Sequence, residues 1–117
     1  MNIKQGDIFW VSPNEVNNIS SDYTHPHVVI QVNASIVNVC AITSNLKHAK
    51  EIGYVLLDEG EANLTKQSVV VASKMFTTDI KQLDKYIGSL TEQRVQQILA
   101  SMRFLDAMTQ RREREVL

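Results

Sequence analysis

Two histidines flank a proline where a polar segment meets an apolar run, in the stretch YTHPHVVIQ at positions 23–31. An imidazole titrates near neutral pH, so it can accept and return a proton within one reaction cycle. Because residues two apart in extended backbone point to the same face, we expect the rings of His25 and His27 to converge. Pro26 stiffens the backbone between them. The pattern predicts either a proton-transfer site or a polar loop edge, with one ring exposed and the other capping a strand.

Hydroxyl groups and positive charges follow at the end of the next apolar run. Thr43 and Ser44 stand where IVNVCAI gives way to a polar segment. Hydroxyls and N–H groups at such a rim can bind a phosphate oxygen, and they can equally cap local backbone. Lys47, His48 and Lys50 come next and form a compact cationic or protonatable group. This group suits a polyanion or a solvated loop.

The pattern does not favour a metal centre. Such a site needs three or four ligands, and Cys40 and His48 are the only other soft donors, with no close spacing to His25 and His27. Cys40 lies within an apolar run and is expected in the core, where a thiol is not a nucleophile. We therefore predict no metal and no cofactor.

The length, composition and charge of the chain indicate one soluble domain spanning 1–117. The chain has 117 residues, is 44% apolar, and carries 12 basic and 13 acidic side chains for a formal charge of -1. Any contact with a nucleic acid must therefore come from a local patch. One cysteine excludes an internal disulfide and fits a reducing compartment. The sequence shows no secretory signal or membrane span, so we expect a cytoplasmic location and no membrane partner.

Short β-branched and aromatic runs separated by polar segments predict an antiparallel sheet. The expected strands are 6–11, 27–32, 36–42, 54–58, 68–73 and 86–90. Within the first of them, Phe9 and Trp10 are expected to pack, although alternation turns one of the two outward, where an aromatic ring could stack on a base. The polar segment 12–26 is a long loop, and such loops are often functional.

A helical period begins at Thr91. An apolar face is formed by Val95, Ile98, Leu99, Met102 and Leu105. Thr91 is the expected N-cap, and the helix is expected over about 91–110. The fold class is therefore mainly β with a C-terminal helix (α+β), in which a small curved sheet or barrel occupies about 4–90.

Six segments in this order resemble the MazF/PemK family of toxin–antitoxin endoribonucleases between Lys4 and Leu105. They are QGDIFWV, a polar loop, HPHVVIQ, VCAITSN, SVVVASKMFTTD and LDKYIGSLTEQRVQQIL. The resemblance implies an SH3-like small β-barrel, metal-independent cleavage of single-stranded RNA, an antitoxin protein as partner, and a homodimer. The alternative is a catalytically inactive module of the same fold that binds a protein partner or a nucleic acid.

The resemblance also implies roles for individual residues. The family has an arginine before the proline that opens the second strand, and His25 stands at that position. His25 would be the general base or acid, and Thr43 and Ser44 would hold the scissile phosphate. Compared with an arginine at this position, a histidine lacks the permanent positive charge and the forked set of N–H donors.

The expected substrate-binding residues are His27, Gln31, Lys47 and Lys74. Gln31 matches the family pattern, and Lys74 replaces a family amide. Either His27 or Lys74 would supply positive charge or the second proton.

Overall fold

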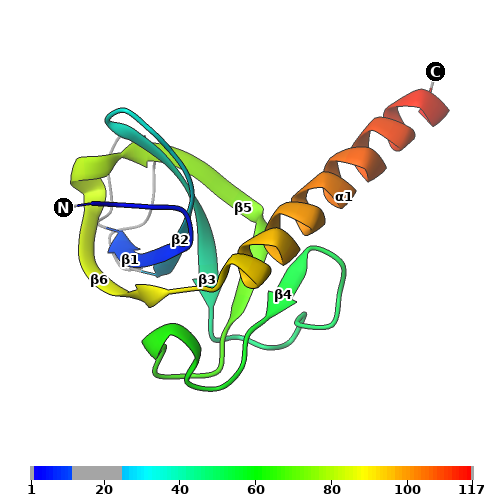
Figure 1. Ribbon diagram of the computed structural model, residues 1–117. Helices are drawn as coiled ribbons and strands as arrows, with labels where there is room; N and C mark the ends of the chain where they lie inside the picture. Colours follow the sequence, from blue (N-terminus) through cyan, green and yellow to red (C-terminus); the bar gives the residue numbers. More distant parts are fainter. Residues whose placement is uncertain (1, 12–24, 117) are drawn as a thin grey trace.

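Within residues 2–11 and 25–116, which this computed structural model describes, six strands form one antiparallel sheet and a long helix follows them (Figure 1). The strands are β1 (Asp7–Val11), β2 (Pro26–Asn33), β3 (Ile36–Thr43), β4 (Tyr54–Leu56), β5 (Val69–Asp79) and β6 (Leu83–Ser89). The helix is α1 (Glu92–Val116), and two 3-10 turns, η2 (Glu61–Asn63) and η3 (Ile80–Gln82), flank β5. The order across the sheet is β4-β5-β3-β2-β1-β6. The predicted fold class, mainly β with a C-terminal helix, is confirmed.

Register shifts curve the sheet. The β2–β3 pairing slips between Val29 and Gln31, and the β3–β5 pairing slips between Cys40 and Ile42. Such irregularities increase local twist and bend a strand. β5 is long enough to pair with β4 at its start and with β3 along its length. The result is a barrel-like sheet that stays open, because β4 and β6 are its two edges.

The curved sheet has an apolar core on each face. The helix-side core contains Ile8, Val28, Ile30, Cys40, Ile42, Val55, Leu57, Leu64, Val70, Leu90, Val95 and Ile98. The hairpin-side core contains Phe9, Val29, Val37 and Val39. Neighbouring residues of a strand point to opposite faces, so a strand buried on both faces is a continuous apolar run in the sequence. This explains the run VVI in β2.

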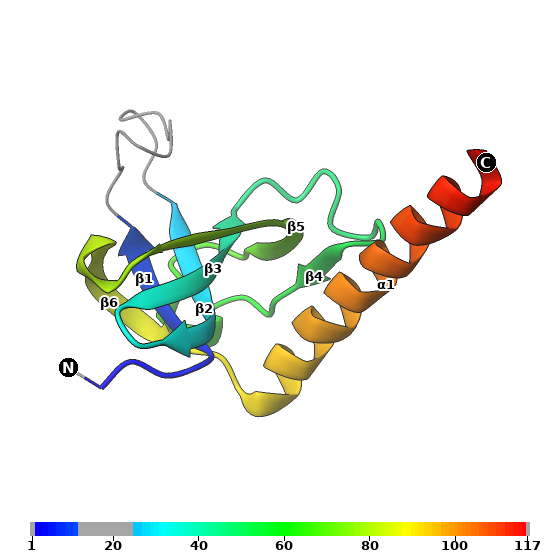
Figure 2. The same ribbon diagram turned by 90° about the horizontal axis from the view of Figure 1, so that it is seen from above.

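The first half of α1 packs on the helix-side core, and the second half extends away from the sheet (Figures 1 and 2). Val95 and Ile98 are buried against the sheet, as the helical period predicts. The Thr91 hydroxyl accepts a hydrogen bond from the Arg94 backbone N–H at 3.2 Å, which confirms Thr91 as a helix cap. The helix continues to Val116, beyond the predicted end.

The turn η2 contacts both the edge strand β6 and the start of α1. The Asn63 side-chain amide donates to the Ile87 carbonyl oxygen at 3.1 Å. The Arg94 guanidinium forms a two-pronged ion pair with Glu61, with Nε to Oε2 at 2.9 Å and Nη2 to Oε1 at 3.0 Å. Such paired contacts fix orientation as well as position. The chain that follows η2 is thereby held beside the sheet.

Three strand boundaries differ from the prediction by more than one residue. β4 ends at Leu56, β6 begins at Leu83, and β5 continues through 74–79 because those residues pair with β3. The alternating, partly polar segment KMFTTD lacks the apolar run on which the prediction relied. Residues 12–24 of the predicted loop 12–26, which include Tyr23 and Thr24, lie outside the described residues. No helix in the described part of the chain has the length and apolarity needed to cross a membrane.

Candidate active site

A groove of about 520 Å³ opens between the β1–β2 end of the sheet, β6 and the segment after η2. It is lined by Trp10, His25, Pro26, Ile42, Ser44, Asn63, Leu64, Thr65, Lys66, Ser68, Lys85, Tyr86 and Ile87. We call it the large groove. Its floor is apolar and its rim carries hydroxyl, amide and ammonium groups, as expected of a site that orients a polar ligand.

A second cavity of about 220 Å³, the small pocket, adjoins the large groove because His25 and Ile42 line both. Its lining is His25, Ala41, Ile42, Thr43, Asn45, His48, Tyr54, Val71 and Lys74. His25 therefore stands between the two cavities. On one side it shares a cavity with Ser44, and on the other it shares one with Thr43 and Lys74.

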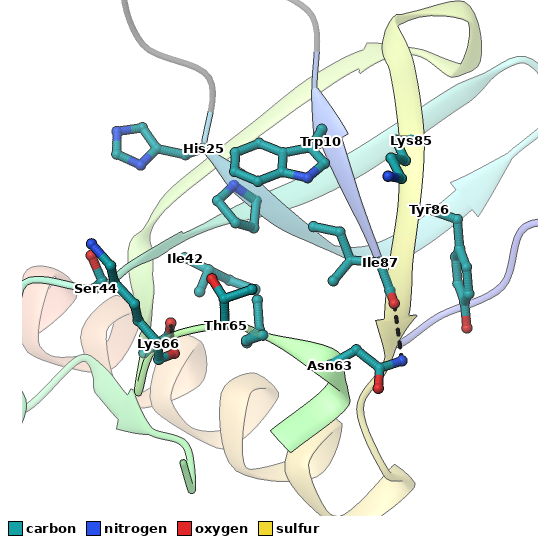
Figure 3. A pocket seen from close by; sticks show the side chains of 13 residues that line it. Trp10, His25, Ile42, Ser44, Asn63, Thr65, Lys66, Lys85, Tyr86 and Ile87 are labelled. Carbon is teal, nitrogen blue, oxygen red and sulfur yellow. Dashed lines mark hydrogen bonds between the residues drawn. The ribbon is translucent and has the colours of Figure 1, made fainter. Parts of the chain in front are cut away.

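The close view shows how the polar groups surround the large groove. In Figure 3 Trp10 and His25 lie along one side of the groove with the His25 ring directed away from the indole, Ser44 and Lys66 lie together near His25, and Lys85 lies on the far side of Trp10. These side chains come from β1, the residue before β2, the end of β3, the η2–β5 connection and β6. The curvature of the sheet brings these five separate segments together.

The end of β3 explains why the two hydroxyls enter different cavities. Thr43 and Ser44 are consecutive, and consecutive residues of extended backbone point to opposite sides. The Thr43 hydroxyl oxygen accepts a hydrogen bond from the Asn45 backbone N–H at 3.2 Å, so it also serves as a local cap. Its own O–H hydrogen can still be donated to a ligand.

Positive charge gathers at the two cavities. Among residues 2–11 and 25–116, no carboxylate lines either cavity, whereas Lys66 and Lys85 line the large groove and Lys74 lines the small pocket. The His48 ring, also in the small pocket, contacts Glu51 with Nδ1 to Oε2 at 2.8 Å. A chain with a formal charge of -1 thus presents a local cationic surface, which is the electrostatic requirement for holding a phosphodiester backbone.

His27 corrects one expectation. Its ring is only 7% exposed and packs edge-on against Phe76, with 5.2 Å between ring centroids, and it lines neither cavity. Desolvation by burial lowers its pKa from the ordinary value. The two rings do not converge on the groove, because β2 is buried on both faces and the inward side at His27 is the hairpin-side core.

Two other predicted substrate-binding residues also lie outside both linings. Gln31 is exposed farther along β2, where its side-chain oxygen accepts a hydrogen bond from Asn38 at 3.3 Å. Lys47 is exposed, and its backbone N–H donates to the Asn45 side chain at 3.1 Å. Of the four expected substrate-binding residues, the structure brings only Lys74 to a cavity shared with His25.

Cys40 is a core residue, as predicted. It is fully buried, its Sγ lies 2.9 Å from the Val71 carbonyl oxygen, and burial raises its pKa to about 12. A thiol in this state is not a nucleophile at neutral pH. In the described residues no three histidine, cysteine, aspartate or glutamate side chains gather closely enough to hold a metal ion.

Sequence reasoning missed several residues of the large groove. Trp10 is 36% exposed whereas Phe9 is buried, so the outward member of the pair lines the groove. Thr65 and Lys66 arrive from the η2–β5 connection and Lys85 from β6. The hydroxyl–lysine pair Thr65–Lys66, separated from β5 by two residues, was the available signal, but only the curvature of the sheet brings it to the groove that His25 lines.

Comparison with known proteins relates this geometry to one family. A family model described as "PemK-like, MazF-like toxin of type II toxin-antitoxin system" matches residues 4–105. A mycobacterial endoribonuclease solved in complex with its cognate antitoxin superposes with a TM-score of 0.68 at 15% identity, over 86% of this chain and 91% of that chain. A mycobacterial endoribonuclease gives 0.64 at 16% identity, over 84% and 85%. The Mycobacterium tuberculosis toxin MazF-mt6 gives 0.65 at 18% identity, over 82% and 91%. At these identities the structural likeness shows the fold.

Proposed function

Because the chain belongs to the PemK-like, MazF-like toxins of type II toxin–antitoxin systems, we propose that it is an endoribonuclease that cleaves single-stranded RNA without a metal ion. The observation that carries this proposal is the position of His25, between a cavity that holds Ser44 and one that holds Thr43 and Lys74. The solved relatives named as endoribonucleases support the proposal through the shared fold.

RNA brings its own nucleophile, the 2′-hydroxyl beside the scissile phosphate. In the proposed reaction neutral His25 removes the 2′-hydroxyl proton, and the 2′-oxygen attacks phosphorus. The bond from phosphorus to the 5′-oxygen breaks, and that oxygen takes a proton from an ammonium group. The products are a 2′,3′-cyclic phosphate and a 5′-hydroxyl. Water is not consumed in this step.

The groove supplies groups for each remaining requirement. The hydroxyls of Thr43 and Ser44 hold the non-bridging oxygens, where negative charge builds up in the transition state. Lys74 shares the small pocket with His25 and replaces His27 as donor of the second proton and of positive charge. These side chains carry out proton transfer and charge stabilisation by themselves, which supports the proposed metal independence.

Trp10 is the proposed platform for an unpaired base. Its exposed indole lines the large groove together with His25, and Lys85 lines the same groove, where it would meet the RNA backbone (Figure 3). Stacking of a base on an aromatic side chain contributes about 1–3 kcal/mol.

We expect Trp10→Ala to weaken the binding of a short single-stranded RNA by about 5- to 150-fold, which is that stacking energy expressed as an affinity ratio. Trp10→Phe, which keeps an aromatic face, should lose much less. Both substitutions are made in a His25→Ala background so that the RNA stays intact, and affinity is measured by fluorescence anisotropy. Equal affinities for the Ala and Phe variants would remove Trp10 from the binding site.

An antitoxin protein is the proposed partner, since one solved relative was determined in complex with its cognate antitoxin. The homodimer implied by the resemblance stays a prediction. The experiment that tests the proposed activity is incubation of the purified chain with single-stranded RNA in the presence of EDTA. Cleavage in EDTA supports a metal-independent ribonuclease. Folded protein that leaves the RNA intact, with or without added divalent ions, indicates the binding module instead.

A further inference from the structure

His27 lines neither cavity, but its ring is hydrogen-bonded to His25, which lines both. Its Nδ1 lies 2.7 Å from the backbone carbonyl oxygen of His25. The ring also makes an edge-on contact with Phe76, and His27 is almost fully buried. A short hydrogen bond from a buried, packed ring holds the atom that accepts it in place.

The chemistry of this contact determines the state of the ring. A carbonyl oxygen only accepts hydrogen bonds, so Nδ1 must carry the hydrogen. Burial disfavours the charged ring, and His27 is therefore the neutral tautomer with hydrogen on Nδ1 and none on Nε2. The ring acts as a donor to backbone.

The bond adds a third restraint on the backbone at His25. Pro26 follows, so His25 is confined to extended backbone by the proline ring. Pro26 itself is paired with Trp10 at the start of β2. The carbonyl oxygen of His25 is in addition held by the hydrogen bond from His27.

We infer that His27 is a positioning residue that, by donating from Nδ1 to the His25 carbonyl, sets the direction in which the His25 ring enters the cavities. This inference rests on the proposed ribonuclease function, since it assigns His27 to the orientation of the proposed base. The two histidines thus have different roles, since His25 transfers the proton and His27 holds His25 in place. A catalytic group misplaced by about 1 Å can lose roughly 100-fold in rate.

The test compares His27→Leu with His27→Asn. Leucine fills the apolar site but cannot donate, whereas the asparagine amide nitrogen stands the same number of bonds from Cα as Nδ1 and can. We expect kcat for cleavage of a single-stranded RNA to fall by about 10- to 100-fold in His27→Leu, with KM changed by less than about 3-fold. His27→Asn should recover most of kcat. Thermal melting of both variants reports whether they are folded.

The outcomes separate this inference from the proposed function. If His25→Ala abolishes cleavage but His27→Leu keeps full kcat, or if the Leu and Asn variants lose activity equally, the positioning role is wrong and the ribonuclease stands. If the wild-type chain cleaves no RNA, the proposed function itself fails. Nuclear magnetic resonance of the wild-type chain with isotope-labelled histidine gives a reading that does not depend on variants. It should show His27 as the neutral Nδ1–H tautomer, and an Nε2–H tautomer would overturn the inference.

Discussion

Replacing His25 by alanine is expected to reduce RNA cleavage by about 10²- to 10⁴-fold, the contribution typical of a general acid or base. The reason is geometric, because His25 lines both the large groove, which Ser44 also lines, and the small pocket, which Thr43 also lines. The hydroxyls and lysines that remain can still bind a phosphodiester, so the loss should appear mainly in kcat. The measurement is single-turnover cleavage of a short single-stranded RNA with enzyme in excess.

The matched control is Lys81→Ala. Lys81 is exposed in η3 and lines neither cavity, so its removal changes the net charge without touching the site. Its cleavage rate should stay close to that of the wild type. A His25→Ala variant that is folded and cleaves at the wild-type rate would show that another group takes the proton.

The substitution Gly88→Ala is expected to damage both the fold and the groove. Gly88 lies in β6 where η2 crosses it, and an added Cβ would clash with the backbone carbonyl of Ala62, lying 2.8 Å from its carbonyl carbon. Because the obstacle is backbone, the whole turn must move. Overpacking of this kind costs about 1–3 kcal/mol, and each kcal/mol lowers the melting temperature of a domain of this size by about 4 °C.

The displaced turn leads directly into the groove. Asn63, Thr65 and Lys66 all line the large groove, and the Asn63 bond to Ile87 crosses at the same place. RNA cleavage should therefore fall at temperatures where Gly88→Ala is still folded. Melting is followed by circular dichroism, and Gly60→Ala, whose Cβ would meet nothing within 4 Å, reports the separate cost of a positive φ, which Gly60 has and Gly88 does not. An unchanged melting temperature and rate in Gly88→Ala would contradict the described packing of η2 on β6.

Local sequence signals were enough to predict the helix and the strand cores. Val95 and Ile98 follow a helical period and are buried where that period requires, and Thr91 caps the helix. The end of β5 could not be predicted in the same way. Residues 74–79 are held in the strand by pairing with β3. That contact is distant in sequence, so local strand propensity does not predict it.

The candidate site likewise contains residues that a local sequence pattern predicts and residues that only tertiary contacts bring into place. His25, Thr43 and Ser44 sit at the ends of apolar runs, where a sequence pattern already marks the rim of a sheet. His27 was expected in the groove because the alternation rule gives the side of a strand but not what covers that side. Here the hairpin-side core covers it. Lys66 and Lys85 reach the groove only through the curvature created by the register shifts.

The chemistry of the newly formed RNA ends tests the central claim most directly. A defined single-stranded RNA is incubated with the chain in EDTA, and the fragments are weighed by mass spectrometry. Attack by the 2′-oxygen predicts fragments that end in a 2′,3′-cyclic phosphate and begin with a 5′-hydroxyl, and it predicts their loss in His25→Ala. Fragments bearing a 5′-phosphate and a free 3′-hydroxyl, formed only when a divalent ion is restored, would contradict it.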